Sequence, residues 1–277
     1  MTSNKRIAPW IVALVVIVLI VAGAWYLRQH RQSAPAPVPA ASTATRPAAA
    51  STAPEHPIAQ AASSPASAST APLPALADSD GAVASALARL LGADDVASHL
   101  AASDYIPRFV AMVDALPRRG LGRNVLPLKP PPGHFTTAGT DDELTLSEDD
   151  FARYDTYMQW VRDVDVSAWV AWYVHAYPLF QQAYRNLGYP HGYFNDRLVT
   201  VINHLLQAPE PRGPVAVVKT DKGYAFADPA LEKRSAGQKM MLRVGPTNEK
   251  IIKRKLRAIR DAVTGAAGPV AGASTGR

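Results

Sequence analysis

Three side chains that could perform acid–base chemistry or bind a metal ion lie close together in this sequence: His191, Asp196 and His204. Asp196 and His204 are spaced so that a helix through them would place both on one face. A hydrolase could use His191 as a base that Asp196 orients, and the three side chains together could bind a metal ion. The spacing matches no established zinc or nucleophile motif. A helix N-cap at Asn195 or Asp196, after a turn at Gly192, explains the same residues without catalysis.

Aromatic residues form a second candidate site. Thirteen of the 21 aromatic residues fall between residues 151 and 194, and Trp169 and Tyr173 are spaced to share a face of one long helix. Their rings could line a groove in which a sugar or a peptide stacks. A stripe with this spacing is more often part of a hydrophobic core, so both interpretations are open.

Basic residues gather in the last predicted helix, residues 247–263. Ile252, Leu256 and Ile259 recur at helical spacing and are expected to face the core, which leaves the cations outside. The cations that could bind an anionic partner are Lys250, Lys253, Arg254, Arg257 and Arg260. Such a face can equally be a solvated surface, a favourable charge near the helix C-terminus or a dock for an acidic segment of the same domain.

The two halves of the folded region have opposite charge. Residues 78–165 hold 8 Lys or Arg against 15 Asp or Glu, a net charge of −7, whereas residues 166–262 hold 15 against 7, a net charge of +8. An anionic protein surface, lipid headgroups or a wall polymer would complement the basic half. The sequence contains no named nucleic-acid-binding motif, and we expect no nucleic-acid partner.

The absence of several residue types and motifs excludes further classes of catalysis and binding. The chain contains no cysteine, which excludes thiolate catalysis and cysteine-based zinc sites. It also contains no GxSxG elbow, P-loop or GxGxxG fingerprint, and we expect no cofactor. Ser103, Ser147 and Ser235 stand at predicted helix starts, where a cap explains them.

The elements that must position these residues form a mainly α domain over residues 78–263. Helices are expected at 80–91, after Ser103, after Ser147, from Asp165 to Leu187 with Pro178 kinking or dividing it, at 195–206 and at 247–263. Two small β-hairpins are expected, at 135–146 and 215–227. The fold class is therefore a helical globular domain with two small hairpins, followed by a flexible tail over residues 264–277.

A transmembrane helix is predicted ahead of the domain. Residues 7–27 carry no charge, and roughly 20 apolar residues suffice to cross a bilayer. Trp10 and Trp25 lie near its two ends, where aromatic rings favour the membrane interface. A cleaved signal peptide, with residues 1–6 as its basic start, is the alternative. The length of the apolar run favours the retained anchor.

Residues 28–77 are predicted to be a disordered linker. Ala, Pro, Ser and Thr fill 37 of the 45 positions from 33 to 77, and such a segment cannot bury enough apolar surface to become ordered. A short head, one span, a linker and a large domain suit a bacterial inner-membrane protein with the bulk of the chain in the periplasm.

Three passages carry a resemblance to a known family: Leu126–Phe135 (LPLKPPPGHF), Gly188–Leu206 (GYPHGYFNDRLVTVINHLL) and Phe226–Pro246 (FADPALEKRSAGQKMMLRVGP). Together with the predicted anchor and linker, they resemble the proteobacterial family known as domain of unknown function 3014. The resemblance implies a membrane-anchored layout and carries no activity, cofactor or catalytic residue.

Two functions follow as hypotheses. The first is a non-enzymatic interaction module of the cell envelope, in which the helical domain binds an envelope protein or another anionic envelope component. The alternative is a hydrolase that acts on cell-wall polymer or peptide, with its site at residues 191–204. The sequence leaves open whether the protein is an enzyme, although the lack of a catalytic motif favours the first hypothesis.

Overall fold

The computed structural model describes residues 53–61, 72–91, 96–101, 103–122, 125–140, 143–163, 165–221 and 223–266. The predicted transmembrane helix, residues 7–27, lies outside these ranges, as do most of the predicted linker and tail. Among the residues described, no helix combines the length and the apolarity that crossing a membrane requires.

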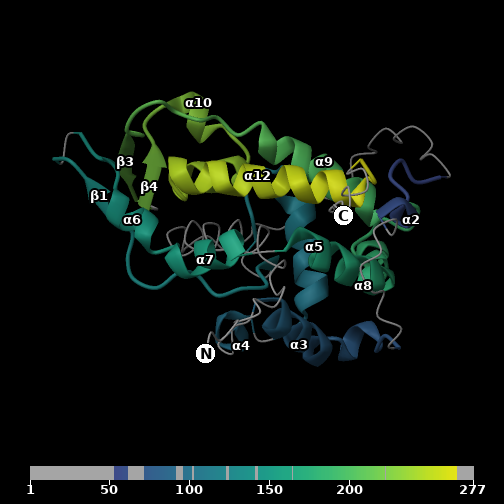
Figure 1. The fold of residues 1–277 in the computed structure, drawn as a ribbon. Helices are drawn as coiled ribbons and strands as arrows, with labels where there is room; N and C mark the ends of the chain where they lie inside the picture. Colours follow the sequence, from purple (N-terminus) through teal and green to yellow (C-terminus); the bar gives the residue numbers. More distant parts are fainter. Residues whose placement is uncertain are drawn as a thin grey trace, which may run out of the picture.

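The described residues fold into a mainly α domain with two small antiparallel hairpins, as predicted (Figure 1). The helices are α2 (Ile58–Ala61), α3 (Asp80–Leu91), α4 (Val96–His99), α5 (Tyr105–Ala115), α6 (Glu148–Ala152), α7 (Asp155–Asp163), α8 (Val166–Asn186), α9 (Phe194–Leu206), α10 (Pro229–Glu232), α11 (Ala236–Arg243) and α12 (Pro246–Val263), with a 3-10 turn, η1 (Leu76–Asp78). The strands are β1 (Thr137–Ala138), β2 (Thr145–Leu146), β3 (Val217–Thr220) and β4 (Gly223–Phe226).

Helix α8 lies at the centre of the fold. Asp165 caps its start by accepting hydrogen bonds from the backbone amides of Ser167 (2.8 Å) and Ala168 (3.3 Å), and Gly188, at a φ of 113°, follows its end. Helices α3, α5, α9 and α12 all pack against it. Pro178 does not divide the helix, because packing on several sides supports the turn that lacks one backbone hydrogen bond.

The two hairpins meet edge to edge at one end of the domain. Strand β1 pairs with β2, and β3 pairs with β4. The amide of Leu146 donates to the carbonyl of Val215 (2.9 Å), and the amide of Val217 donates to the carbonyl of Leu144 (2.8 Å). A small second core beneath them contains Leu146, Val217, Phe226 and Leu242. The joined hairpins therefore lie beside the start of α12.

Residues 53–61 differ from the prediction of a disordered linker, and we call them the strap. They lie against α8 and α12 at the end of the domain opposite the hairpins (Figure 1), and Ala61 is buried. Helix α8 explains this order, because its buried face is broad and needs cover from several elements, while Pro178, Gln182 and Arg185 keep another face exposed. Ile58 of the strap packs against the main core, as do Leu73 and Leu76 further along the chain.

Candidate functional site

Helix α12 carries the candidate site. It begins after Gly245, whose φ of 89° favours glycine, and a Cβ there would come within 2.6 Å of the Phe151 ring. Ile252, Leu256 and Ile259 are buried, as their helical spacing predicts. The buried face therefore fixes which side chains the helix presents to solvent.

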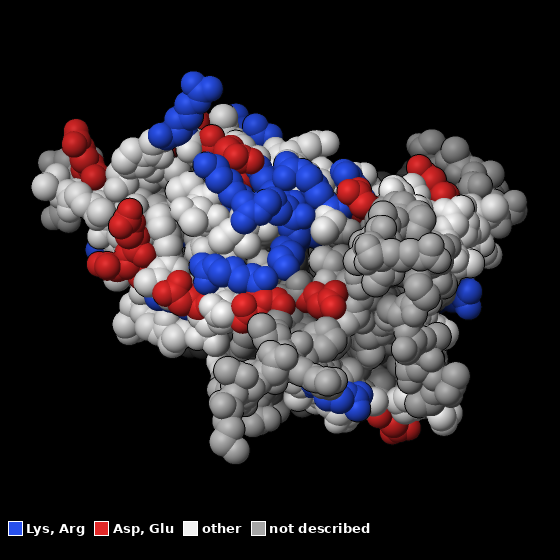
Figure 2. Space-filling view, in the orientation of Figure 1, with Lys and Arg blue, Asp and Glu red and all other residues white. Residues whose placement is uncertain are grey.

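Three cations lie on the outer face of α12: Lys250, Arg254 and Arg257 are all exposed. We call these three residues the cationic face. None of them forms an ion pair with a carboxylate of the described ranges. Figure 2 shows Lys and Arg atoms gathered over α12, with Asp and Glu atoms along a neighbouring edge. Cations gathered on one face in this way create a positive potential that an anionic partner would neutralise.

Arg260 is less available than the cationic face. It is half-buried, and its guanidinium donates to the carboxylate of Asp261 at 2.9 and 2.8 Å. It also donates to the amide oxygen of Asn203 at 3.3 Å. Its charge is therefore already partly neutralised within the domain.

Lys253 was predicted to be one of the exposed cations, and the structure corrects this. Its side chain is 3% exposed, and its Nζ donates to the carbonyl of Ala208 at 2.6 Å and to Glu210 at 2.7 Å, with an oxygen of Glu249 at 3.0 Å. Residue 253 falls next to Leu256 on the helix surface, at the edge of the buried face. A buried ammonium group requires such partners, so Lys253 stabilises the fold and is not accessible to a ligand.

A groove of about 750 Å³ runs between the start of α12 and the joined hairpins. Two cations, Lys250 and Arg212, line it together with three carboxylates, those of Glu148, Glu210 and Glu249. The Glu249 side chain is 2% exposed. Burial raises the pKa of Glu249 to about 7, although the hydrogen bond and charge of Lys253 act in the opposite direction. A volume of this size is typical of ligand sites. Lys250 lines the groove and is also part of the cationic face, so the two surfaces adjoin each other.

The sequence analysis did not single out Glu249, Glu210 or Arg212. The spacing of Glu249 and Lys253, four residues apart on one helix, was a signal that an ion pair would form. Nothing comparable pointed to Glu210, because that residue lies in a different segment of the chain and reaches Lys253 only in the folded domain.

The structure does not bring His191, Asp196 and His204 together as a metal site. No group of three or more His, Asp or Glu side chains in the described ranges is arranged to hold a metal ion. His191 is exposed. The Nε2 atom of His204 lies 2.8 Å from the Oγ of Ser235, and burial lowers the pKa of His204, with two nearby arginines adding to the effect. This histidine therefore supports the start of α11, which Ser235 caps as predicted.

Asn195 and Asp196 do not cap α9, contrary to the simpler interpretation of the sequence. The N-cap residue is Tyr193, whose side chain makes no capping bond. The amide of Phe194 instead donates to the side chain of Gln181, on α8, at 2.9 Å. The polar side chains of Asn195 and Asp196 are consequently available to the strap.

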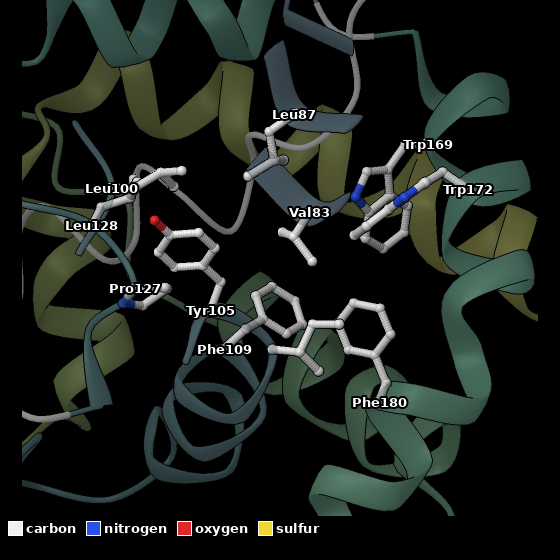
Figure 3. A pocket seen from close by; sticks show the side chains of 11 residues that line it. Val83, Leu87, Leu100, Tyr105, Phe109, Pro127, Leu128, Trp169, Trp172 and Phe180 are labelled. Carbon is white, nitrogen blue, oxygen red and sulfur yellow. The ribbon is translucent and has the colours of Figure 1, made fainter. Parts of the chain in front are cut away.

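Trp169 and Tyr173 belong to the hydrophobic core and not to an open groove. They are 3% and 0% exposed, and their rings stack with centroids 5.1 Å apart. Figure 3 shows the cavity beside Trp169, where the rings of Trp172, Phe109 and Phe180 also converge. Its volume of about 50 Å³ is far below the range of roughly 300–1,000 Å³ that holds a ligand, so it is a packing defect.

The fold and the site together define a helical domain with a cationic face on its last helix. The chain matches the family described as "Protein of unknown function (DUF3014)" over residues 105–260, more than half of its length. It therefore belongs to that family, as the sequence resemblance indicated. Neither a curated protein nor a solved structure matches the chain.

Replacing Lys253 with Met should destabilise the domain by about 3 kcal/mol, because breaking a buried ion pair leaves Glu249 without its cation. Replacing Lys250 with Met should change stability by no more than about 0.5 kcal/mol, since that side chain is exposed. Denaturant unfolding followed by tryptophan fluorescence measures both changes. Equal effects of the two substitutions would contradict the assignment of Lys253 to the interior.

Replacing Glu249 with Gln should change the pH dependence of stability. The pKa of Glu249 is raised to about 7 in the folded state, from an ordinary value of 4.5, so between these values the folded chain binds more protons and loses stability as pH rises. The Gln variant lacks this loss and should gain about 1–3 kcal/mol relative to wild type between pH 5 and pH 8. The Glu148→Gln variant, which removes an exposed carboxylate, is the control, and an equal pH-dependent gain in both variants would contradict the assignment to Glu249.

Proposed function

We propose that the protein is a membrane-anchored, non-enzymatic interaction module of the cell envelope, and that the cationic face of α12 binds an anionic surface of a partner protein. The observation that carries this proposal is the set of three exposed cations, Lys250, Arg254 and Arg257, that pair with no carboxylate of the described ranges. Held on one rigid helix, they lose little conformational freedom when a partner binds.

The groove beside α12 supports the same proposal. It is continuous with the cationic face through Lys250, and Arg212 adds a further exposed cation at its lining. Because the groove also carries the carboxylates of Glu148, Glu210 and Glu249, a partner would enter it with groups of mixed charge while its own carboxylates contact Arg254 and Arg257. Charge complementarity of this kind raises the rate of association and selects partners.

The predicted anchor at residues 7–27 and the Ala/Pro-rich linker give the proposal its location. They suit a bacterial inner-membrane protein whose domain works in the periplasm at some distance from the bilayer. The hydrolase alternative receives no support from the geometry, because His204 contacts Ser235 and Asp196 contacts the strap.

Reversing the cationic face tests the proposal. The triple variant Lys250→Glu, Arg254→Glu and Arg257→Glu should reduce partner capture at least tenfold, because like charges then meet across the interface. The measurement is in-cell crosslinking of the full chain, followed by quantitative mass spectrometry of the crosslinked proteins. Lys253 stays unchanged, since reversing a buried charge would unfold the domain.

A matched control has the same change in net charge on a different surface: Lys219→Glu, Lys233→Glu and Arg234→Glu, all at exposed positions. This variant should capture the partner as the wild type does. Equal capture by both triple variants would remove the cationic face from the proposal. Recovery of wall fragments without any protein would replace the protein partner with a wall polymer.

A further inference from the structure

We propose that the first turn of α9 and the end of α12 form a peptide-binding site, and that the strap is its exchangeable ligand. The ligand class is a peptide with a bent backbone that leads into a short helix with an apolar residue and an alanine on its inner side. The occupant in this structure is the chain's own segment, residues 53–61.

The polar part of the site recognises the peptide main chain. The two carboxylate oxygens of Asp196 accept hydrogen bonds from the consecutive amides of Glu55 (3.0 Å) and His56 (2.7 Å). The side-chain amide of Asn195 donates to the carbonyl of His56 at 2.8 Å. The Glu55 side chain itself is 80% exposed. Recognition of this part therefore depends on a bend that points two consecutive amides the same way, and it tolerates different side chains.

The apolar part of the site sets the side-chain requirement. Ala61 is 5% exposed, and Ile58 packs partly buried against the main core. A Cβ at Gly265 would lie 3.1 Å from the carbonyl oxygen of Gln60, so the end of the domain approaches the strap backbone closely. A larger side chain at position 61, or a charged one at position 58, would not fit.

The site is held in place without help from the strap. Asn195 is fully buried. Its side-chain oxygen accepts a hydrogen bond from the Tyr173 hydroxyl at 3.3 Å, and its side-chain amide also donates to the carbonyl of Val263 at 3.2 Å. These contacts join α8, α9 and α12 and fix the Asn195 rotamer. A preorganised site of this kind remains ready to bind when the peptide leaves.

The strap binds weakly enough to exchange. It contributes nine residues and three side-chain-mediated hydrogen bonds, whereas stable interfaces use roughly 20–30 residues on each side. Only residues 62–71 separate it from Pro72, so its effective concentration at the site is on the order of millimolar. At this effective concentration the strap occupies the site even though its affinity for the site is low. Asn195 and Asp196 lie within the residues that match the family, and the strap lies outside them.

Release of the strap would lengthen the tether, a consequence that rests on the proposed membrane anchoring. The free chain after the predicted span would grow from residues 28–52 to residues 28–71. For a random coil of these two lengths, the root-mean-square span is about 28 Å and about 36 Å. A partner that presents a suitable peptide would therefore extend the reach of the domain while it binds.

Competition in hydrogen exchange tests the site in the full chain and does not depend on the anchor. An acetylated peptide with the sequence of residues 53–61 is added at several millimolar, and exchange is followed for the chain's own strap. We expect strap exchange to rise at least threefold, while α9 stays protected. The control peptide has Asp in place of Ile58 and Ala61 and should have no effect.

A variant chain gives a second measurement. Asp196→Ala removes both carboxylate contacts, so exchange of the strap should rise at least tenfold while the melting temperature of the domain is retained. Asp261→Ala, another surface carboxylate of the same region, should leave strap exchange unchanged. If neither the peptide nor Asp196→Ala alters strap exchange, the site does not exist as proposed. A fixed strap that responds to Asp196→Ala but not to millimolar peptide overturns exchangeability.

Discussion

The need to cover the broad apolar face of helix α8 is the constraint on which the rest of the structure depends. Its 21 residues include buried side chains that point in several directions, and each large apolar side chain contributes roughly 1.5–3 kcal/mol when it is removed from water. Helices α5, α9 and α12 cover part of it, and α3 and the 3-10 turn η1 cover more. The strap adds to this cover at one end of the domain, which is why a segment with the composition of a linker is ordered.

Polar groups at the boundaries of this core specify how the covering elements align. Gln181 on α8 accepts hydrogen bonds from Tyr177 and from the amide of Phe194, and so fixes where α9 begins. Lys253 ties α12 to the segment around Glu210. Each group would destabilise the interior if it stood alone, because an unpaired buried polar atom has lost its water. Together they hold α12 in one rotation, with the cationic face outward.

Local signals in the sequence were sufficient to predict most of the fold. Caps at Ser147, Asp165 and Ser235 accept hydrogen bonds from amides two or three residues later, so their chemistry is contained in short segments. The hairpins and the buried stripe of α12 followed from periodicity in the same way. The predicted cap at Ser103 was wrong, because α5 begins after Asp104 and the amides of Asp104 and Tyr105 donate to Asp80 in α3. The partners of Asn195 and Asp196, and Glu210 and Ala208 as partners of Lys253, could not be predicted, because they lie in other segments and meet these residues only in the folded chain. The prediction of disorder was wrong for the strap, because it rested on the average composition of the linker. That average does not reveal the few residues that contact α8.

The two ends of α12 belong to different sites, the groove at its start and the strap site at its end. The groove and Lys250 lie at its start, whereas Val263, which Asn195 contacts, is its last residue, about 26 Å away along the axis. No described residue of the cationic face contacts the strap. Two sites influence each other only when a ligand at one changes contacts at the other, and here no contact is shared. In the proposed module, the cationic face would therefore set the affinity for a partner, and the strap would separately set the distance at which that partner is met.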